Sequence, residues 1–134
     1  MNRLEYIPGD LVSVYVGIKK YIVEVIGTEN ENEVLSYQIK FQNGEIQYAD
    51  KDNIVQIPLT SEILEKNGWV KDKECSFKTQ LYYKKNFGVN IITIIAINED
   101  FRVVYNTTYI RHIQYVHQLQ HLLFGLDINP EMEV

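Results

Sequence analysis

The sequence has very little cysteine: Cys75 is the single thiol among 134 residues, so no disulfide can form within the chain. Long apolar runs are also missing, because the longest, Ile91 to Ile97, is far shorter than the about 20 residues of a membrane-spanning helix. The first residues carry an acid, Glu5, and a proline, Pro8, where a signal peptide needs an apolar core. We therefore predict a cytoplasmic protein with no membrane association.

Basic residues are also in short supply. Residues 1–57 hold five Lys or Arg against nine Asp or Glu, a net charge of −4, and residues 58–134 hold eight against nine, a net charge of −1, which together give −5. Proteins that bind nucleic acid nonspecifically need a basic surface to neutralise phosphates, so this balance argues against a nucleic-acid partner. The sequence has no G-x-x-x-x-G-K-[ST], G-x-G-x-x-G or C-x-x-C motif. We therefore predict no cofactor.

Residues 1–57 are typical of short strands separated by turns. The predicted strands cover 11–16, 21–26, 34–41, 45–49 and 52–57, and Asn43-Gly44 is a strong hairpin signal. Closing short strands into a barrel removes exposed edges. The order resembles that of SH3-like barrels, with Gly9-Asp10-Leu11-Val12 entering the first strand. We predict a small SH3-like β-barrel over residues 1–57.

Residues 58–134 predict an α-β-β-β-α unit, which gives the whole chain an α+β fold class. A short helix follows Pro58, with Thr60 or Ser61 at its N-terminus and Gly68 at its exit. Strands are expected at 76–84, 89–97 and 102–108, and the middle one, apolar on both faces, is expected to be central. A helix over 109–126 has a wide apolar arc that is expected to cover this three-stranded antiparallel sheet, with a tail over 127–134.

Tyrosine is frequent, with ten residues in the chain. Tyr15, Tyr37 and Tyr48 lie on predicted strands of the first half, and surface aromatics of small barrels bind proline-rich or methylated peptides by stacking and cation–π contacts. The alternative is that these rings only pack in the core or across strands. These three tyrosines are the candidate ligand-binding residues, and a protein or peptide is the expected partner.

His117 and His121 stand at i and i+4 of the predicted last helix, a spacing that can hold one metal ion. Gln118 occupies the place of the glutamate in H-E-x-x-H, so the general base of that motif is missing. The alternative interpretation puts both imidazoles on the polar face of the helix, with His112 and Gln120 in the apolar arc. No residues qualify as a catalytic set, because Cys75 has no base beside it in the sequence.

Two stretches resemble small uncharacterised proteins of gut anaerobes and their phage-like elements. One is Ile57-Pro58-Leu59-Thr60-Ser61-Glu62-Ile63-Leu64-Glu65-Lys66-Asn67-Gly68-Trp69, and the other is Tyr115-Val116-His117-Gln118-Leu119-Gln120-His121-Leu122. These proteins have no established activity, so the resemblance implies a mobile-element or accessory context and no mechanism.

Three functions fit the sequence. The first is a non-enzymatic binding or adaptor protein, based on the tyrosines and the missing catalytic set. The second is a structural or assembly component that forms a homo-oligomer through the strand at Ile91 to Ile97, should that strand lie at a sheet edge. The third is a metal-binding protein or metal-dependent hydrolase, based on His117 and His121. The sequence does not specify the oligomeric state.

Overall fold

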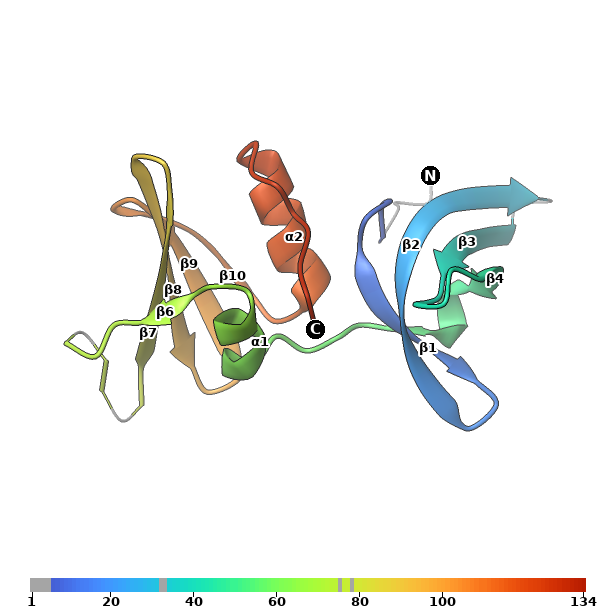
Figure 1. Cartoon of the computed structure of the whole chain (residues 1–134), viewed down its shortest axis with the longest axis horizontal. Coiled ribbons are helices and arrows are strands. Elements are labelled where there is room, and N and C mark those ends of the chain that lie inside the picture. Colours follow the sequence, from blue (N-terminus) through green and yellow to red (C-terminus); the bar gives the residue numbers. More distant parts are fainter. Residues whose placement is uncertain (1–5, 32–33, 75, 78) are drawn as a thin grey trace. The chain divides into compact units, whose positions relative to one another are not determined.

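The computed structural model describes residues 6–31, 34–74, 76–77 and 79–134. The chain forms two compact units, Met1–Ile57 (unit 1) and Pro58–Val134 (unit 2). Each unit is built on one five-stranded antiparallel sheet (Figure 1). Among the described residues, no helix is long and apolar enough to cross a membrane.

Unit 1 is a sheet with strand order β4-β3-β2-β1-β5. Its elements are β1 (Leu11–Val16), β2 (Lys19–Glu31), β3 (Val34–Lys40), β4 (Ile46–Asp50), the 3₁₀ helix η1 (Lys51–Asn53) and β5 (Ile54–Val55). The predicted hairpin turn is confirmed: Phe41 N–H donates to Glu45 O at 2.8 Å, and Gly44 has φ +91°. The alternating residues of β1, β2 and β3 form the core of the unit, which includes Val12, Val14, Val23, Val25, Tyr37 and Ile39.

The predicted SH3-like barrel is corrected to an open five-stranded sheet, whose outer strands are β4 and β5. β4 pairs with β3, and β5 pairs with β1 at Ser13 and Val14, but no pairing between β4 and β5 occurs in the described part of the chain. β2 is longer than predicted and curves strongly along its length (Figure 1), with a register shift between Val25 and Gly27. Curvature and a bulge let one sheet wrap its own core without a hydrogen-bonded seam between its outer strands.

Unit 2 has a sheet with strand order β10-β9-β8-β7-β6. Its elements are α1 (Ser61–Lys66), β6 (Val70–Lys71), β7 (Leu81–Phe87), β8 (Asn90–Ile97), β9 (Asp100–Tyr105), β10 (Thr108–Ile113) and α2 (Val116–Gly125). The predictions of a short helix at Ser61 and of a central position for the isoleucine-rich strand are confirmed. One face of β8 is buried through Ile92, Ile94 and Ala96, whereas Ile91 on the other face is 42% exposed.

The predicted α+β class and the α-β-β-β-α unit are wrong, because the chain is mostly β and unit 2 has five strands. Residues 108–113, which we expected to start a helix over 109–126, form β10 instead. The turn before it has Asn106 at φ +55°, and the following run of β-branched and aromatic residues pairs with β9 from Thr108 to Ile113. The helical period that begins at Ile113 and continues through Val116 and Leu119 was extended back over residues that form a strand.

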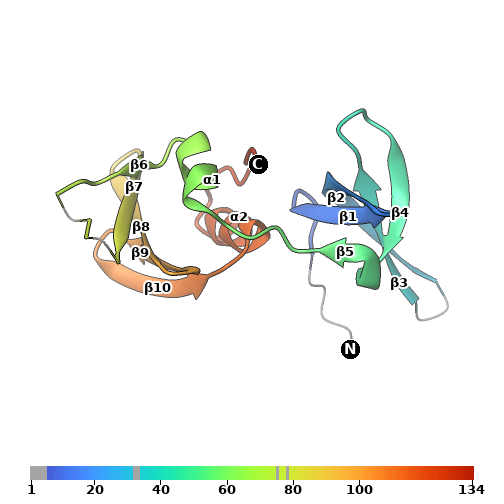
Figure 2. The ribbon, with the colours of Figure 1, turned by 90° about the horizontal axis from the view of Figure 1, so that it is seen from below.

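The second helix, α2, begins at Val116, and the side chain of Gln118 caps its N-terminus. Gln118 Oε1 accepts from Gln114 N–H at 2.8 Å and from Tyr115 N–H at 3.1 Å. Beside this cap, Leu59 N–H donates to Gln114 O at 2.9 Å, and Pro58 and Tyr115 form an isolated antiparallel bridge. The start of unit 2 is thereby joined to the point where β10 ends and α2 begins (Figure 2).

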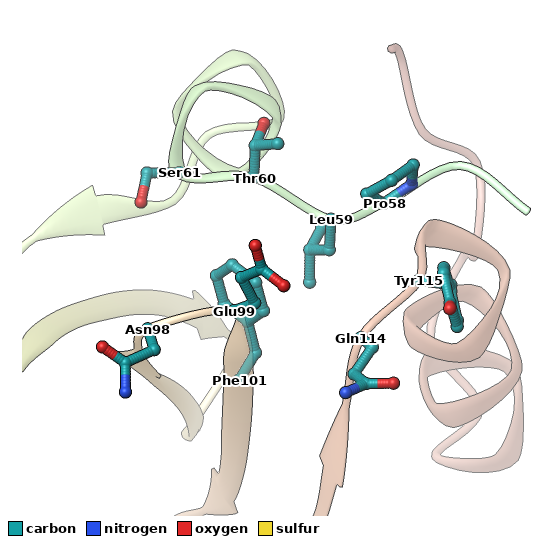
Figure 3. Close-up of a pocket in the computed structure, with 9 residues that line it drawn as sticks. All are labelled: Pro58, Leu59, Thr60, Ser61, Asn98, Glu99, Phe101, Gln114 and Tyr115. Carbon is teal, nitrogen blue, oxygen red and sulfur yellow. The ribbon is translucent and has the colours of Figure 1, made fainter.

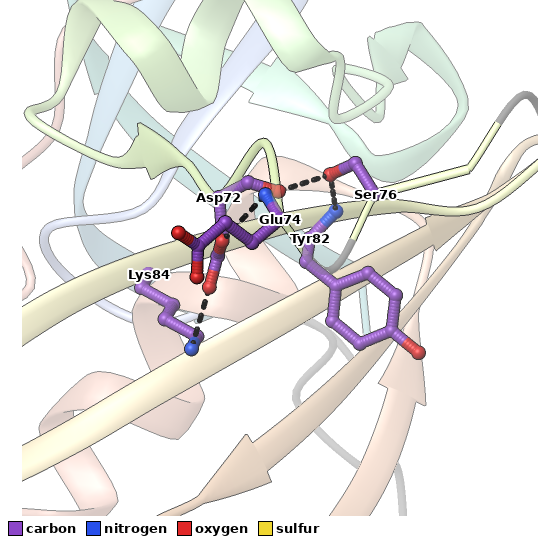
Figure 4. Close-up of polar contacts among 5 residues, drawn as sticks. All are labelled: Asp72, Glu74, Ser76, Tyr82 and Lys84. Carbon is purple, nitrogen blue, oxygen red and sulfur yellow. Dashed lines mark hydrogen bonds and ion pairs between the residues drawn. The ribbon is translucent and has the colours of Figure 1, made fainter.

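Asp72 organises the connection between β6 and β7 (Figure 4). Its carboxylate pairs with Lys84 Nζ at 2.7 Å and accepts from Glu74 N–H at 3.0 Å. The Ser76 hydroxyl donates to Asp72 O at 2.6 Å and accepts from Tyr82 N–H at 3.0 Å. Together with the main-chain bond from Asp72 N–H to Tyr82 O at 2.7 Å, these side-chain contacts hold Asp72 and Ser76 beside the start of β7.

Replacing Gln118 tests the cap. We expect Gln118→Ala to lower the free energy of unfolding of unit 2 by about 1 kcal/mol, because two N–H groups lose their acceptor. Gln118→Glu keeps a side-chain oxygen that can accept from both N–H groups, and the variant should unfold like the wild type. Denaturant unfolding followed by the fluorescence of Trp69, the one tryptophan of the chain, reports on unit 2. Equal stability of Gln118→Ala and Gln118→Glu would contradict the capping role.

Candidate functional site

A cleft on unit 1, here called the tyrosine cleft, brings Tyr15 and Tyr48 to the same surface. It has a volume of about 250 Å³. Its lining comes from β1, β3, β4 and η1 and consists of Val14, Tyr15, Val16, Ile39, Phe41, Gln47, Tyr48, Ala49, Asp50 and Asn53. Tyr15 is 48% exposed and Tyr48 59% exposed, whereas Ile39 and Ala49 belong to the core. The cleft therefore has an apolar floor and two exposed aromatic side chains.

The tyrosine cleft is bounded by strands that have an open edge. β5 covers β1 only at Ser13 and Val14, so Tyr15 and Val16 have no strand partner on that side among the described residues. β4 pairs with β3 along one edge, and no described strand pairs with the other. Open edges present main-chain donors and acceptors that can pair with an added strand.

The electrostatics of the cleft combine aromatic faces with a carboxylate. Lys20, the direct partner of Tyr15 in the β1–β2 ladder, places its Nζ over the Tyr15 ring at 5.9 Å from the centroid. Asp50 lines the cleft and is exposed, within a unit whose net charge is −4. Phe41, also in the lining, packs edge-on against Tyr21 with centroids 5.8 Å apart. Such a surface can take an aliphatic or aromatic side chain next to a basic one.

Tyr37, the third candidate tyrosine, lies elsewhere. Its side chain is fully buried in the core of unit 1 and packs edge-on against Tyr6 with centroids 5.3 Å apart. Its hydroxyl has no hydrogen-bond partner among the described residues. Tyr15 and Tyr48 therefore share one surface, and Tyr37 contributes to folding. The alternation of side chains along β3 is consistent with this burial, because Tyr37 lies on the same face as the apolar residue Ile39.

A larger cleft, of about 450 Å³, lies on unit 2 (Figure 3). Residues 58–61 run along one side, and Asn98, Glu99 and Phe101 of the β8–β9 hairpin lie opposite them (Figure 3). Gln114 and Tyr115 line the end of the cleft nearest Pro58. Two of its polar side chains already serve the fold, because Thr60 Oγ1 caps α1 through Ile63 N–H and Gln114 Nε2 donates to Asp100 Oδ1. Among the described residues that line this cleft, Glu99 is the one carboxylate, and none carries an imidazole, amine or thiol. The lining offers hydrogen bonds for binding, with no nucleophile paired to a base.

The histidines of α2 are close to each other but differ in burial. The His117 and His121 rings meet edge-on with centroids 5.5 Å apart, and Tyr115 stacks on His117 at 6.1 Å. His117 is 4% exposed, so its predicted place on a polar helix face is wrong. His112, predicted inside an apolar arc, is exposed on β10, whereas Gln120 is buried as predicted. Within the described ranges, no three His, Cys, Asp or Glu side chains are grouped to hold a metal ion.

The lysines of the second half are partly engaged within unit 2. Lys84 pairs with Asp72, and Lys85 Nζ donates to Asn67 O at 2.6 Å while lying 5.4 Å from the centroid of the Phe87 ring. Cys75 and Lys78 lie outside the described residues. These contacts give Lys84 and Lys85 a structural role within unit 2.

No protein-family model matches the chain, and neither a curated protein nor a solved structure shows significant similarity to it.

Removing the Tyr37 hydroxyl should be harmless. We expect Tyr37→Phe to leave the stability of unit 1 unchanged or to raise it by up to about 1 kcal/mol, since a buried hydroxyl without a partner is lost. Tyr37→Ala should lower it by about 3–5 kcal/mol through the cavity it creates. Denaturant unfolding followed by far-UV circular dichroism measures both. A loss above about 1 kcal/mol in Tyr37→Phe would show that the hydroxyl is needed.

Proposed function

We propose that the protein is a non-enzymatic binding module whose unit 1 takes up an extended peptide in the tyrosine cleft. The observation that carries the proposal is the coincidence of three features at one place. They are the exposed rings of Tyr15 and Tyr48, the exposed carboxylate of Asp50, and the open edges of β1 and β4. Each of these features matches a different part of a peptide.

The main chain of the peptide pairs with an open strand edge. Strand addition of this kind supplies affinity through main-chain hydrogen bonds, and pockets for alternate side chains supply specificity. The apolar floor of Ile39 and Ala49 receives a side chain that points inward.

A basic side chain of the peptide lies against Tyr48 and Asp50. A cation over a tyrosine ring is stabilised by the ring quadrupole, as Lys20 over Tyr15 illustrates within the protein itself. The net charge of −4 on unit 1 attracts basic segments and repels acidic ones. The preferred partner is therefore a basic, extended stretch of another protein.

The alternative of a homo-oligomer was based on the strand at Ile91 to Ile97. It required the Ile91 to Ile97 strand to lie at a sheet edge, but β8 is paired on both sides, with β7 and β9. No additional edge remains on this strand for a second copy.

The test begins with selection of binders from a random peptide display library, followed by fluorescence anisotropy with the strongest peptide. We expect selected peptides to be rich in Lys and Arg, and Tyr48→Ala or Asp50→Asn to weaken binding roughly tenfold. Tyr109→Ala is the matched control, because Tyr109 is similarly exposed at 55% but lies on β10 of unit 2. Failure to select any binder, or equal losses in Tyr48→Ala and Tyr109→Ala, would refute the proposal.

Strand addition has its own signature. Methylation of alternate peptide nitrogens removes donors on one edge of the bound strand only. We expect one of the two methylation registers to weaken binding by more than tenfold and the other to leave it nearly unchanged. Equal effects of both registers would show that the peptide does not bind as an added strand.

A further inference from the structure

The last residues of unit 2, 127–134, turn out of α2 at Asp127 and continue without regular secondary structure. Side chains of α2 and of the end of α1 hold this segment. Asn67, which follows α1, accepts from Glu133 N–H through Oδ1 at 2.7 Å and donates from Nδ2 to Glu133 O at 2.7 Å. Lys66 Nζ donates to the main-chain oxygen of Val134 at 3.1 Å. Gln120 of α2, which is 3% exposed, donates from Nε2 to Pro130 O at 3.2 Å.

All four of these bonds end on main-chain atoms of the segment. The paired bonds of Asn67 reproduce what a neighbouring β-strand would offer to one residue. The segment has no regular secondary structure, and its exposure alternates along the chain. Ile128, Pro130, Met132 and Val134 are half-buried, whereas Asn129, Glu131 and Glu133 are exposed.

Such recognition depends little on which side chains the segment carries. Main-chain bonds accept any extended residue, and the half-buried positions require only an apolar side chain at every second place. None of the residues in the segment is fully buried, and three of the four bonds are exposed to solvent. Exposed bonds and little apolar burial are the features of regions that detach at low free-energy cost.

We propose that the surface formed by Lys66, Asn67 and Gln120 is a second binding site, for extended peptides of another protein, and that segment 127–134 is its displaceable resident. The partner is a peptide with apolar residues at alternate positions and acidic or amide residues between them, the pattern that the segment itself displays. The site lies wholly within unit 2, so the proposal does not rest on the function proposed for unit 1.

Displacement follows from competition between an attached and a free peptide. The resident segment is present at an effective concentration in the millimolar range, which lowers the apparent affinity for any outside peptide. Weakening the resident without touching Lys66, Asn67 or Gln120 should therefore increase the affinity for an added peptide. Glu133→Pro does this, because proline lacks the N–H that donates to Asn67 Oδ1.

The experiment uses the full chain and a fluorescein-labelled peptide with the sequence of residues 126–134, followed by fluorescence anisotropy. We expect the Glu133→Pro protein to bind this peptide at least tenfold more tightly than the wild type does. Glu131→Ala is the matched control, because its side chain is exposed and its main chain is unchanged, and it should behave like the wild type. Equal affinity in the Glu133→Pro and wild-type proteins, or no saturable binding to either up to about 1 mM, would overturn the proposal.

The contact to Asn67 is tested from both sides. In the Glu133→Pro background, Asn67→Ala should weaken peptide binding roughly tenfold, since both paired bonds are lost. Asn67 also donates to Ile63 O, so Asn67→Ala removes a contact of α1 as well. The same loss is therefore measured on the Glu133→Pro protein with Asn67 intact, using a labelled peptide that carries proline at the position of Glu133. Full binding of the proline peptide would overturn the assignment. A dimer of the wild type that forms by exchange of the segment would also contradict it, because the occupant would then be a second copy.

Discussion

The short antiparallel contact between residues 58–59 and 114–115 is the constraint on which unit 2 depends. Leu59 N–H donates to Gln114 O at 2.9 Å, so the first residues of the unit are held at the junction of β10 and α2. Gln118 fixes the same junction from the other side by accepting from Gln114 and Tyr115. These contacts place the start of α1 and the start of α2 next to one another, far apart though they are in sequence. The cleft of Figure 3 is a direct consequence, since its walls are these two segments.

Asn67 extends this constraint to the rest of the unit. Its main-chain oxygen accepts from Lys85 of β7, and its side chain binds both main-chain groups of Glu133. One residue thus links the end of α1 to the sheet and to the 127–134 segment. Gly68 makes this geometry accessible, because its φ of +87° turns the chain out of the helix toward the buried Trp69.

Local signals in the sequence were informative where one residue dictates the main chain. Asn43-Gly44, Thr60 and Gly68 each occupy the turn or cap that their chemistry predicts. The period of β1 to β3 likewise identified strands. The error over 109–126 arose because Ile113, Val116 and Leu119 fit a helical period although Ile113 ends a strand. Only the pairing of β10 with β9, which no local pattern encodes, decides between the two.

The same limit applies to the candidate site. Of the three candidate tyrosines, Tyr15 and Tyr48 are exposed and Tyr37 is buried. Alternation along a strand separates Tyr37 from Tyr48 only once the inward face of the sheet is known. Asp50, Phe41 and the open edges of β1 and β4 depend on which strands are neighbours, so the sequence could not assign them to the cleft. The burial of His117 was missed because a helical wheel shows only the spacing along the helix. It does not show the ring contacts that His117 makes with Tyr115 and His121.

The sites proposed on the two units both bind the main chain of a guest peptide. Unit 1 presents strand edges that no described strand covers, along β4 and at Tyr15 and Val16 of β1. Unit 2 presents isolated amide side chains, which can satisfy only single residues of a guest, as Asn67 does for Glu133 and Gln120 for Pro130. A strand edge therefore favours a guest that stays extended over several residues, whereas spaced amides tolerate a proline between their contacts, as Pro130 in the resident segment demonstrates. Unit 1 carries an acidic net charge, whereas the resident segment of unit 2 is itself acidic, so the two proposed sites would select guests of opposite charge.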